Sequence, residues 1–172
     1  MTQPDHSFPL QLQRLNELDF DYADGEGIDF EPYRDFLSPE ETTDWFRAWT
    51  GNNEADGTCF RIFGQDGTGG YAAFWITDPE RALLDQPVVF LGSEGETGVI
   101  AEDFSSYLWL LAAGIGPFEA VAYSGSKGSP QEHFEAFAQE VSGQAKLEGA
   151  EVLKKAKARY TDFSSWVESL CR

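Results

Sequence analysis

The most informative stretch of this sequence is residues 87–114, PVVFLGSEGETGVIAEDFSSYLWLLAAG. It begins with a short, continuous apolar run, residues 87–92, which is typical of a buried strand. The turn SEGETG follows, and TGVIAED predicts a strand that returns from it. Asp103 then caps a predicted helix, FSSYLWLLAA, with Gly114 at its C-terminal side. Large side chains recur along this helix at i, i+3, i+4 and i+7 and predict a buried face: Phe104, Tyr107, Leu108 and Leu111.

Two further strands are predicted upstream of this stretch. Residues 58–64, TCFRIFG, and residues 71–76, YAAFWI, flank the turn-rich segment QDGTGG, which is typical of an antiparallel hairpin. The glycines of this segment stand between two strands, whereas a dinucleotide-binding fingerprint leads from a strand into a helix. We therefore interpret them as hairpin glycines and expect an antiparallel sheet of about four strands. Residues 115–123 are predicted as either a loop or an edge strand.

Capping motifs predict helices on either side of the strands. The motif SPEE at residues 38–41 is a capping box with Pro at the first helical position, and its helix ends at Gly51. The motif SPQE at residues 129–132 repeats this device and predicts a second capped helix that Gly143 closes. The chain is expected to stay helical over much of residues 144–170.

These elements predict an α+β fold for residues 1–172: a central, mainly antiparallel sheet of about four or more strands flanked by helices, with a helical C-terminal extension. The expected core covers about residues 31–124, the acidic N-terminal lead-in residues 1–30, and the C-terminal extension residues 125–172. Near the N-terminus, QLQRLNEL predicts a short helix and FDYADGEGIDFEPY an irregular loop.

The chain is strongly acidic, with 30 Asp and Glu against 12 Lys and Arg and a formal charge of −18. Its 41% hydrophobic and 15% aromatic content excludes a disordered acidic chain and predicts a packed core. Nucleic acid and anionic membranes are not expected partners, because both require a basic face. Residues 146–172 carry six basic and four acidic residues, so residues 1–145 hold six basic and 26 acidic residues, a charge of −20. This charge favours either a basic partner or simple solubility.

Catalytic, metal-binding and cofactor motifs are not expected. His6 and His133 are the only histidines, and Cys59 and Cys171 lie far apart, so neither a zinc site nor a Ser-His-Asp arrangement is indicated. The low cysteine content and the lack of a signal peptide favour the cytoplasm. Residues 17–35 hold eight carboxylates, enough to surround a calcium ion, but their spacing is not that of an EF-hand. Calcium binding is therefore kept as an alternative to a solvated or partner-binding acidic loop. The tryptophans are interpreted as core residues from their spacing on predicted elements: Trp45, Trp49, Trp75, Trp109 and Trp166.

Three segments carry a family resemblance: PYRDFLSPEETTDWFRAWTGN, FRIFGQDGTGGYAAFWI and, above all, residues 87–114. Their order resembles the SUKH superfamily, which includes yeast cell-wall assembly regulators and many bacterial immunity proteins. The resemblance covers about half of the chain, residues 31–114. It implies a single α+β domain with a mainly antiparallel sheet and no catalytic constellation. It also implies a role common among bacterial members, which neutralise a toxin, often a nuclease, by binding it directly.

We therefore expect a non-enzymatic, intracellular binding protein, an immunity protein for a basic toxin of the nuclease type. A regulatory or scaffold module of the same fold, bound to an endogenous protein, is the main alternative, and a hydrolase with paired carboxylates is a further one. Exposed acidic loops and turns supply the candidate partner contacts, although the same residues serve solubility in the simplest interpretation. These candidates are Asp19, Asp21, Asp24, Glu26, Asp29, Glu94 and Glu96.

Overall fold

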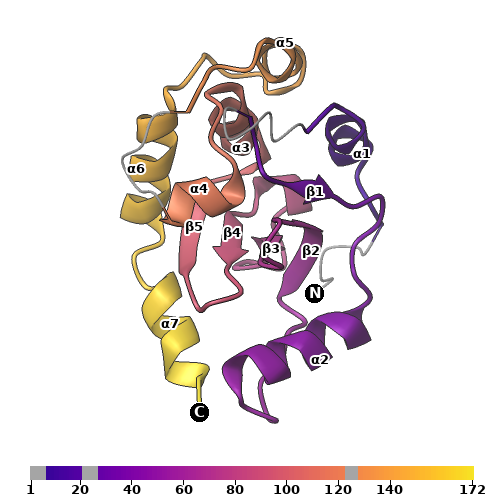
Figure 1. The fold of residues 1–172 in the computed structure, drawn as a ribbon, viewed down its shortest axis with the longest axis vertical. Helices are drawn as coiled ribbons and strands as arrows, with labels where there is room; N and C mark the ends of the chain where they lie inside the picture. Colours follow the sequence, from indigo (N-terminus) through magenta and orange to yellow (C-terminus); the bar gives the residue numbers. More distant parts are fainter. Residues whose placement is uncertain (1–6, 21–26, 123–127) are drawn as a thin grey trace.

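The centre of the molecule is an antiparallel sheet of five strands in the order β1-β2-β3-β4-β5 (Figure 1). The computed structural model describes residues 7–20, 27–122 and 128–172. The predicted α+β class, with a mainly antiparallel sheet and C-terminal helices, is confirmed. The strands are β1 (Glu31–Pro32), β2 (Phe60–Gln65), β3 (Tyr71–Trp75), β4 (Val88–Leu91) and β5 (Thr97–Ala101).

Helices cover both faces of this sheet. α1, α3, α4 and α5 contribute to the hydrophobic cluster on one face, α2 and α7 to the cluster on the other, and α6 contributes to both while running beside β5 (Figure 1). None of the helices in the described residues is both long and apolar enough to cross a membrane. Their bounds are α1 (Leu10–Asn16), α2 (Pro39–Thr50), the short 3-10 helix η2 (Leu83–Asp85), α3 (Phe104–Ala112), α4 (Pro117–Ala122), α5 (Glu132–Val141), α6 (Gly149–Arg159) and α7 (Phe163–Leu170).

The two hydrophobic clusters follow from the alternation of side chains along each strand. Phe63 and Phe74 belong to the cluster shared with α3, whereas Ile62 and Ala73 belong to the cluster shared with α2 and α7. α3 is the central helix of the fold, and all of its residues except Ser105 are buried. It contacts β5, α5 and α6, so apolar side chains are needed around its whole circumference.

The predicted caps of α2 and α3 form as expected. The Ser38 hydroxyl oxygen accepts a hydrogen bond of 3.1 Å from the backbone N–H of Glu41. The Asp103 carboxylate accepts one of 2.8 Å from the backbone N–H of Ser106. Each bond satisfies a backbone donor that has no partner inside its own helix.

Residues 115–122 form neither the loop nor the edge strand expected from the sequence, because Pro117–Ala122 is helix α4. Gly114 ends the preceding helix in the left-handed conformation, with φ of +83°. Pro117 then opens α4 at the first helical position, where its missing N–H loses no intrahelical hydrogen bond. Pro117 and Ala120 are buried by this arrangement.

The SPQE motif at residues 129–132 does not cap a helix. α5 begins only at Glu132, and its N-cap residue Gln131 makes no side-chain capping bond. The backbone N–H of Gln131 instead donates to the Ala112 carbonyl at the end of α3, across 2.9 Å. This tertiary contact keeps Gln131 extended, so the local capping signal is overridden.

The segment predicted as an irregular loop ends in a short edge strand, β1. Glu31 pairs with Gln65, and Pro32 pairs with Gly64. A proline is tolerated here because an edge strand leaves one side of its backbone unpaired. The pairing partner lies in a distant hairpin, so no local pattern indicates this strand.

Candidate partner-binding surface

Two hairpin turns lie together at one end of the sheet. Residues 66–70 connect β2 to β3, and residues 92–96 connect β4 to β5. In an antiparallel sheet of sequential hairpins, alternate turns emerge at the same end. The Ser93 hydroxyl donates a hydrogen bond of 3.1 Å to the Thr68 hydroxyl oxygen and joins the two turns directly. We call this region the hairpin end, residues 66–70 and 92–96.

Carboxylates hold the β2–β3 turn in shape. The buried Asp66 accepts hydrogen bonds from the backbone N–H of Gly70 at 2.6 Å and from the Thr68 hydroxyl at 2.7 Å. A third hydrogen bond, of 3.1 Å, is donated by the backbone N–H of Gly67 to the carboxylate of Asp29. Asp29, a predicted contact residue, is therefore docked onto the hairpin end by its own side chain.

The β4–β5 turn carries two of the predicted contact residues, Glu94 and Glu96. The Glu94 side chain is exposed, and Glu94 lines a groove beside the turn. Glu96 is half-buried, and its carboxylate lies against Gly92, where a side chain would collide with it. In this turn the Glu94 side chain is therefore exposed to solvent, whereas the Glu96 side chain covers the backbone at Gly92.

The groove beside Glu94 lies between α2, the β4–β5 turn and α7, and has a volume of about 700 Å³. The Trp49 indole forms part of its wall and donates a hydrogen bond of 2.7 Å to the Gly92 carbonyl. We call it the α2–α7 groove; it is lined by Ala48, Trp49, Ser93, Glu94, Gly95, Thr97, Ser164, Val167, Glu168 and Cys171.

Hydrogen bonds anchor α7 at both ends of this groove. At its N-terminal end, the Thr97 hydroxyl donates to the Ser164 hydroxyl oxygen across 2.9 Å. At its C-terminal end, the Asn52 side-chain amide donates to the Leu170 carbonyl across 2.9 Å. The two walls of the groove are therefore held at a set separation by contacts between residues far apart in the sequence.

The charge and aromatic content of the groove suit a cationic side chain. Among the residues that the structure describes, the charged lining residues are Glu94 and Glu168, both exposed, and no Lys, Arg or His lines the groove. Trp49 adds an aromatic face, which attracts cations electrostatically. Beside it, Trp45 packs against Trp49 with ring centroids 5.9 Å apart and against Tyr71 at 4.9 Å. A Lys or Arg entering the groove would meet carboxylates and aromatic rings together.

The surface around the groove corrects part of the tryptophan prediction. Trp109 is a core residue with 2% exposure, as expected. The other four tryptophans are only half-buried: Trp45, Trp49, Trp75 and Trp166. They pack at the margin of the hydrophobic cluster shared with α2 and α7, because these two helices leave that face of the sheet incompletely covered. Helical spacing identifies a residue on a packed face, but it does not tell whether that residue fills the core or lies at its border.

A smaller pocket of about 250 Å³ adjoins the hairpin end. Its lining includes the carboxylate residues Asp29, Glu31 and Asp66. Nearby, Glu119 of α4 accepts a hydrogen bond of 3.4 Å from the backbone N–H of Asp29. Burial raises the pKa of Glu119 above its ordinary value, and the negative charges of Asp29 and Asp66 add to this shift. Glu119 is not among the lining residues, so the carboxyl group with the raised pKa holds the chain rather than facing the pocket.

The predicted contact residues do not all lie on one surface of the structure. Asp29, Glu94 and Glu96 come together at the hairpin end through the contacts above. Asp19 instead lies at α5, where its carbonyl is 2.8 Å from Nε2 of His133. Asp21, Asp24 and Glu26 lie outside the described residues.

Sequence reasoning missed Trp49 and Glu168 as groove residues. Both lie on predicted helices, and only the packing of α7 beside α2 places them around one groove. No group of three or more His, Cys, Asp or Glu in residues 7–20, 27–122 and 128–172 is arranged to hold a metal ion. Comparison of the chain with protein-family models, with curated proteins and with solved structures finds no match.

Proposed function

We propose that this protein is a non-enzymatic binding protein that acts inside the cell and neutralises a basic, nuclease-type toxin by direct contact. The α2–α7 groove is the observation that carries this proposal. It combines Glu94, Glu168 and the Trp49 indole in a concave surface, and none of its described lining residues is basic. The sequence resemblance to the SUKH superfamily supports an immunity role for such a surface.

Electrostatics supports this choice of partner. A nuclease binds phosphates, so its active cleft is basic. A chain with a formal charge of −18 attracts such a cleft over long range and raises the rate of encounter. Affinity then requires aromatic anchors at the centre of the contact, and half-buried tryptophans beside the groove supply them.

Co-expression with the protein encoded beside this chain tests the proposal. We expect the two proteins to copurify and the chain to protect the cell from its partner's toxicity. The informative variant is Glu94→Lys with Glu168→Lys, because it reverses both charges of the groove. We expect it to lower the association rate about tenfold or more and to flatten its dependence on salt.

A matched control is Asp35→Lys with Glu80→Lys, which changes the net charge equally at two exposed residues outside the groove lining. This control should keep most of the association rate and its salt dependence. Equal losses in the two double variants would contradict the role of the groove. Complex formation without protection would overturn the immunity role and favour a regulatory module.

A further inference from the structure

A second cavity, of about 770 Å³, lies between α3, α6 and the segment that joins α5 to α6. It shares no lining residue with the α2–α7 groove. Its volume falls within the range of about 300–1,000 Å³ that is typical of small-molecule sites. Most of its lining is apolar and includes Ala112, Ala113, Ile115, Leu147 and Leu153. We call it the α3–α6 cavity.

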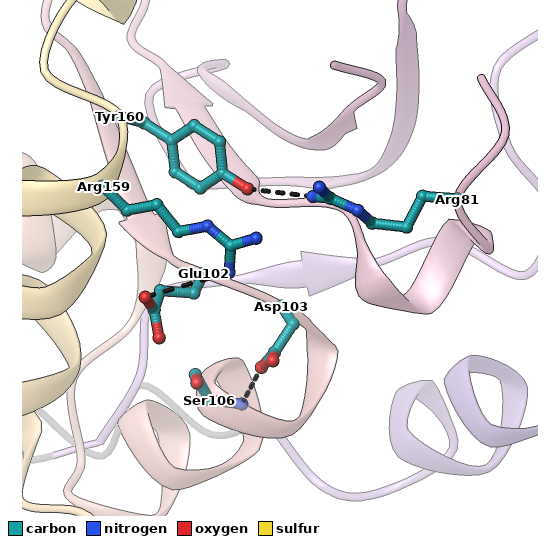
Figure 2. Close-up of polar contacts among 6 residues, drawn as sticks. All are labelled: Arg81, Glu102, Asp103, Ser106, Arg159 and Tyr160. Atoms are coloured by element: carbon teal, nitrogen blue, oxygen red, sulfur yellow. Dashed lines mark hydrogen bonds and ion pairs between the residues drawn. The ribbon is translucent and has the colours of Figure 1, made fainter. Parts of the chain in front are cut away.

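Polar contacts connect the C-terminal end of α6 to the segment after β5 and to Arg81 (Figure 2). The Arg159 guanidinium lies 4.0 Å from the carboxylate of Glu102, the residue that follows β5. The next residue, Tyr160, accepts a hydrogen bond of 3.3 Å from Arg81 through its hydroxyl oxygen. Asp103, adjacent to Glu102, caps α3. Residues 102 and 103 thus lie between the start of α3 and the C-terminal end of α6.

An unpaired donor lies in the wall of the cavity. Trp109 of α3 lines it and is only 2% exposed. Its indole Nε1 is buried and has no hydrogen-bond acceptor among the residues that the structure describes. A buried indole N–H normally finds a partner, since leaving it unpaired is unfavourable. Nε1 itself has almost no accessible surface, so a ligand in the cavity would contact the Trp109 ring and not this donor.

The rim of the cavity concentrates basic residues in an otherwise acidic protein. Its described lining residues include three lysines, Lys146, Lys154 and Lys157, against two glutamates, Glu135 and Glu148. Lys146 is paired with Glu135 at 2.7 Å. Lys154 and Lys157 lie three residues apart on α6, and neither forms an ion pair with a carboxylate of the described residues. Their charges are therefore available to an anion in the cavity.

We infer that the α3–α6 cavity binds an amphipathic organic monocarboxylate of the fatty-acid class. Its apolar chain would cover Ile115, Leu147 and Leu153, which otherwise face an open cavity. Its carboxylate has two oxygens, so one head group can accept hydrogen bonds from the ammonium groups of Lys154 and Lys157. The chemistry of this cavity is opposite to that of the α2–α7 groove, which attracts cations.

Isothermal titration with sodium dodecanoate below its micelle concentration tests this inference on the full chain. We expect saturable binding at one site. Dodecyltrimethylammonium, which has the same tail and a positive head group, should not bind there. In ¹H–¹⁵N spectra, dodecanoate should shift the indole signal of Trp109, which is identified as the signal missing from the Trp109→Phe variant. Absence of saturable binding, or equal binding of the cationic detergent, would overturn the inference.

Variants on α6 locate the site. Lys154→Gln with Lys157→Gln should weaken dodecanoate binding about tenfold, because two cationic donors are lost. Lys155→Gln is the matched control, since Lys155 is exposed on the same helix but does not line the cavity. Ala150→Trp should block binding by filling the cavity, provided that circular dichroism shows a folded protein. Unchanged affinity in the double variant, or an equal loss in the control, would place the binding elsewhere and refute the site.

Discussion

Trp49 and Gly92 are joined by a hydrogen bond of 2.7 Å from the indole Nε1 to the backbone carbonyl. This bond connects α2 to the β4–β5 turn and thereby sets one wall of the α2–α7 groove. The Gly92 carbonyl also accepts a hydrogen bond of 3.2 Å from the backbone N–H of Gly95. The groove is thus a supported feature of the fold and not a gap between loosely packed helices.

Trp49→Phe keeps an aromatic ring but removes this donor, so the Gly92 carbonyl keeps only the 3.2 Å hydrogen bond from the backbone N–H of Gly95. We expect the free energy of unfolding to fall by about 0.5–1.5 kcal/mol, the net contribution of one hydrogen bond. Urea unfolding measures the change. Trp45→Phe is the control on the same helix, since no side-chain hydrogen bond of Trp45 is found in the described residues. Equal losses in both variants would show that ring size, and not the hydrogen bond, matters.

The two cysteines should differ sharply in reactivity. Burial raises the pKa of the Cys59 thiol to about 12, and the negative charge of Asp56 contributes. Because the thiolate is the reactive form, Cys59 should resist iodoacetamide in the native protein at mildly alkaline pH. Cys171 is exposed and should be alkylated first. Peptide mapping by mass spectrometry distinguishes the two sites, and equal reaction in denaturant is the control; rapid native alkylation of Cys59 would contradict the prediction.

Cys171 also reports on the α2–α7 groove, because it is one of its lining residues. A partner that occupies the groove should slow alkylation of Cys171 in the complex relative to the free chain. The denatured complex should show no such protection. Full reactivity of Cys171 in a stable complex would place the partner on another surface.

Glu119 should make stability depend on pH. Its pKa is raised in the folded state by burial above the ordinary value of 4.5. Below that value the group is protonated in both states and its burial carries no ionisation penalty. As the pH rises, the unfolded chain loses this proton first, so the contribution of Glu119 to stability falls until the folded pKa is passed.

The variant Glu119→Gln isolates this effect, because the amide oxygen still accepts from the backbone N–H of Asp29. We expect the variant to gain stability relative to the unmodified chain as the pH is raised from about 4 to about 7. Urea unfolding at several pH values measures the difference. Glu168→Gln, the same substitution at an exposed site, is the control. A stability difference for Glu119→Gln that stays constant with pH, or that equals the control's at every pH, would contradict the raised pKa.

Gly114 should tolerate no side chain. Its φ of +83° is unfavourable for other residues, and a Cβ there would collide with the backbone of Ser129. Gly69 has a φ of +93° but open space around it. Gly69→Ala should therefore cost only about 1–2 kcal/mol of backbone strain, whereas Gly114→Ala should cost more or prevent folding. Thermal unfolding and expression yield compare the two, and equal effects would contradict the steric argument.

The local elements of this fold were predictable where one segment carries its own signal. Ser38 and Asp103 lie directly before apolar helical patterns, and both cap their helices as expected. The hairpins follow from glycine-containing turns between strand-like runs. At Gln131 the same kind of signal failed, because a backbone contact with Ala112 of α3 is made instead of the cap. For α4, Pro117 is a local signal for the start of a helix. The apolar run around it also fits an edge strand, so the helix was not predicted.

The candidate site was predictable only in part. Glu94 is identified by its place in an acidic turn, and the structure puts it at the groove. Asp29 reaches the hairpin end through a hydrogen bond to Gly67, which is separated from it by all of α2 and β2. Trp49 and Glu168 carry no local mark of function, since each occupies an ordinary position on a helix.

The sequence by itself determined strands β2 to β5 with their two hairpins, the central helix α3 and the acidic character of the chain, because periodicity, capping and charge are local or additive properties. Tertiary structure alone decided which residues share a surface. It placed Glu94 and Glu168 around one groove and Lys154 and Lys157 around the α3–α6 cavity. The physical reason is that each site is formed by the packing of separate elements. The position of α6 and α7 against the sheet depends on long-range contacts that no single stretch of the chain encodes.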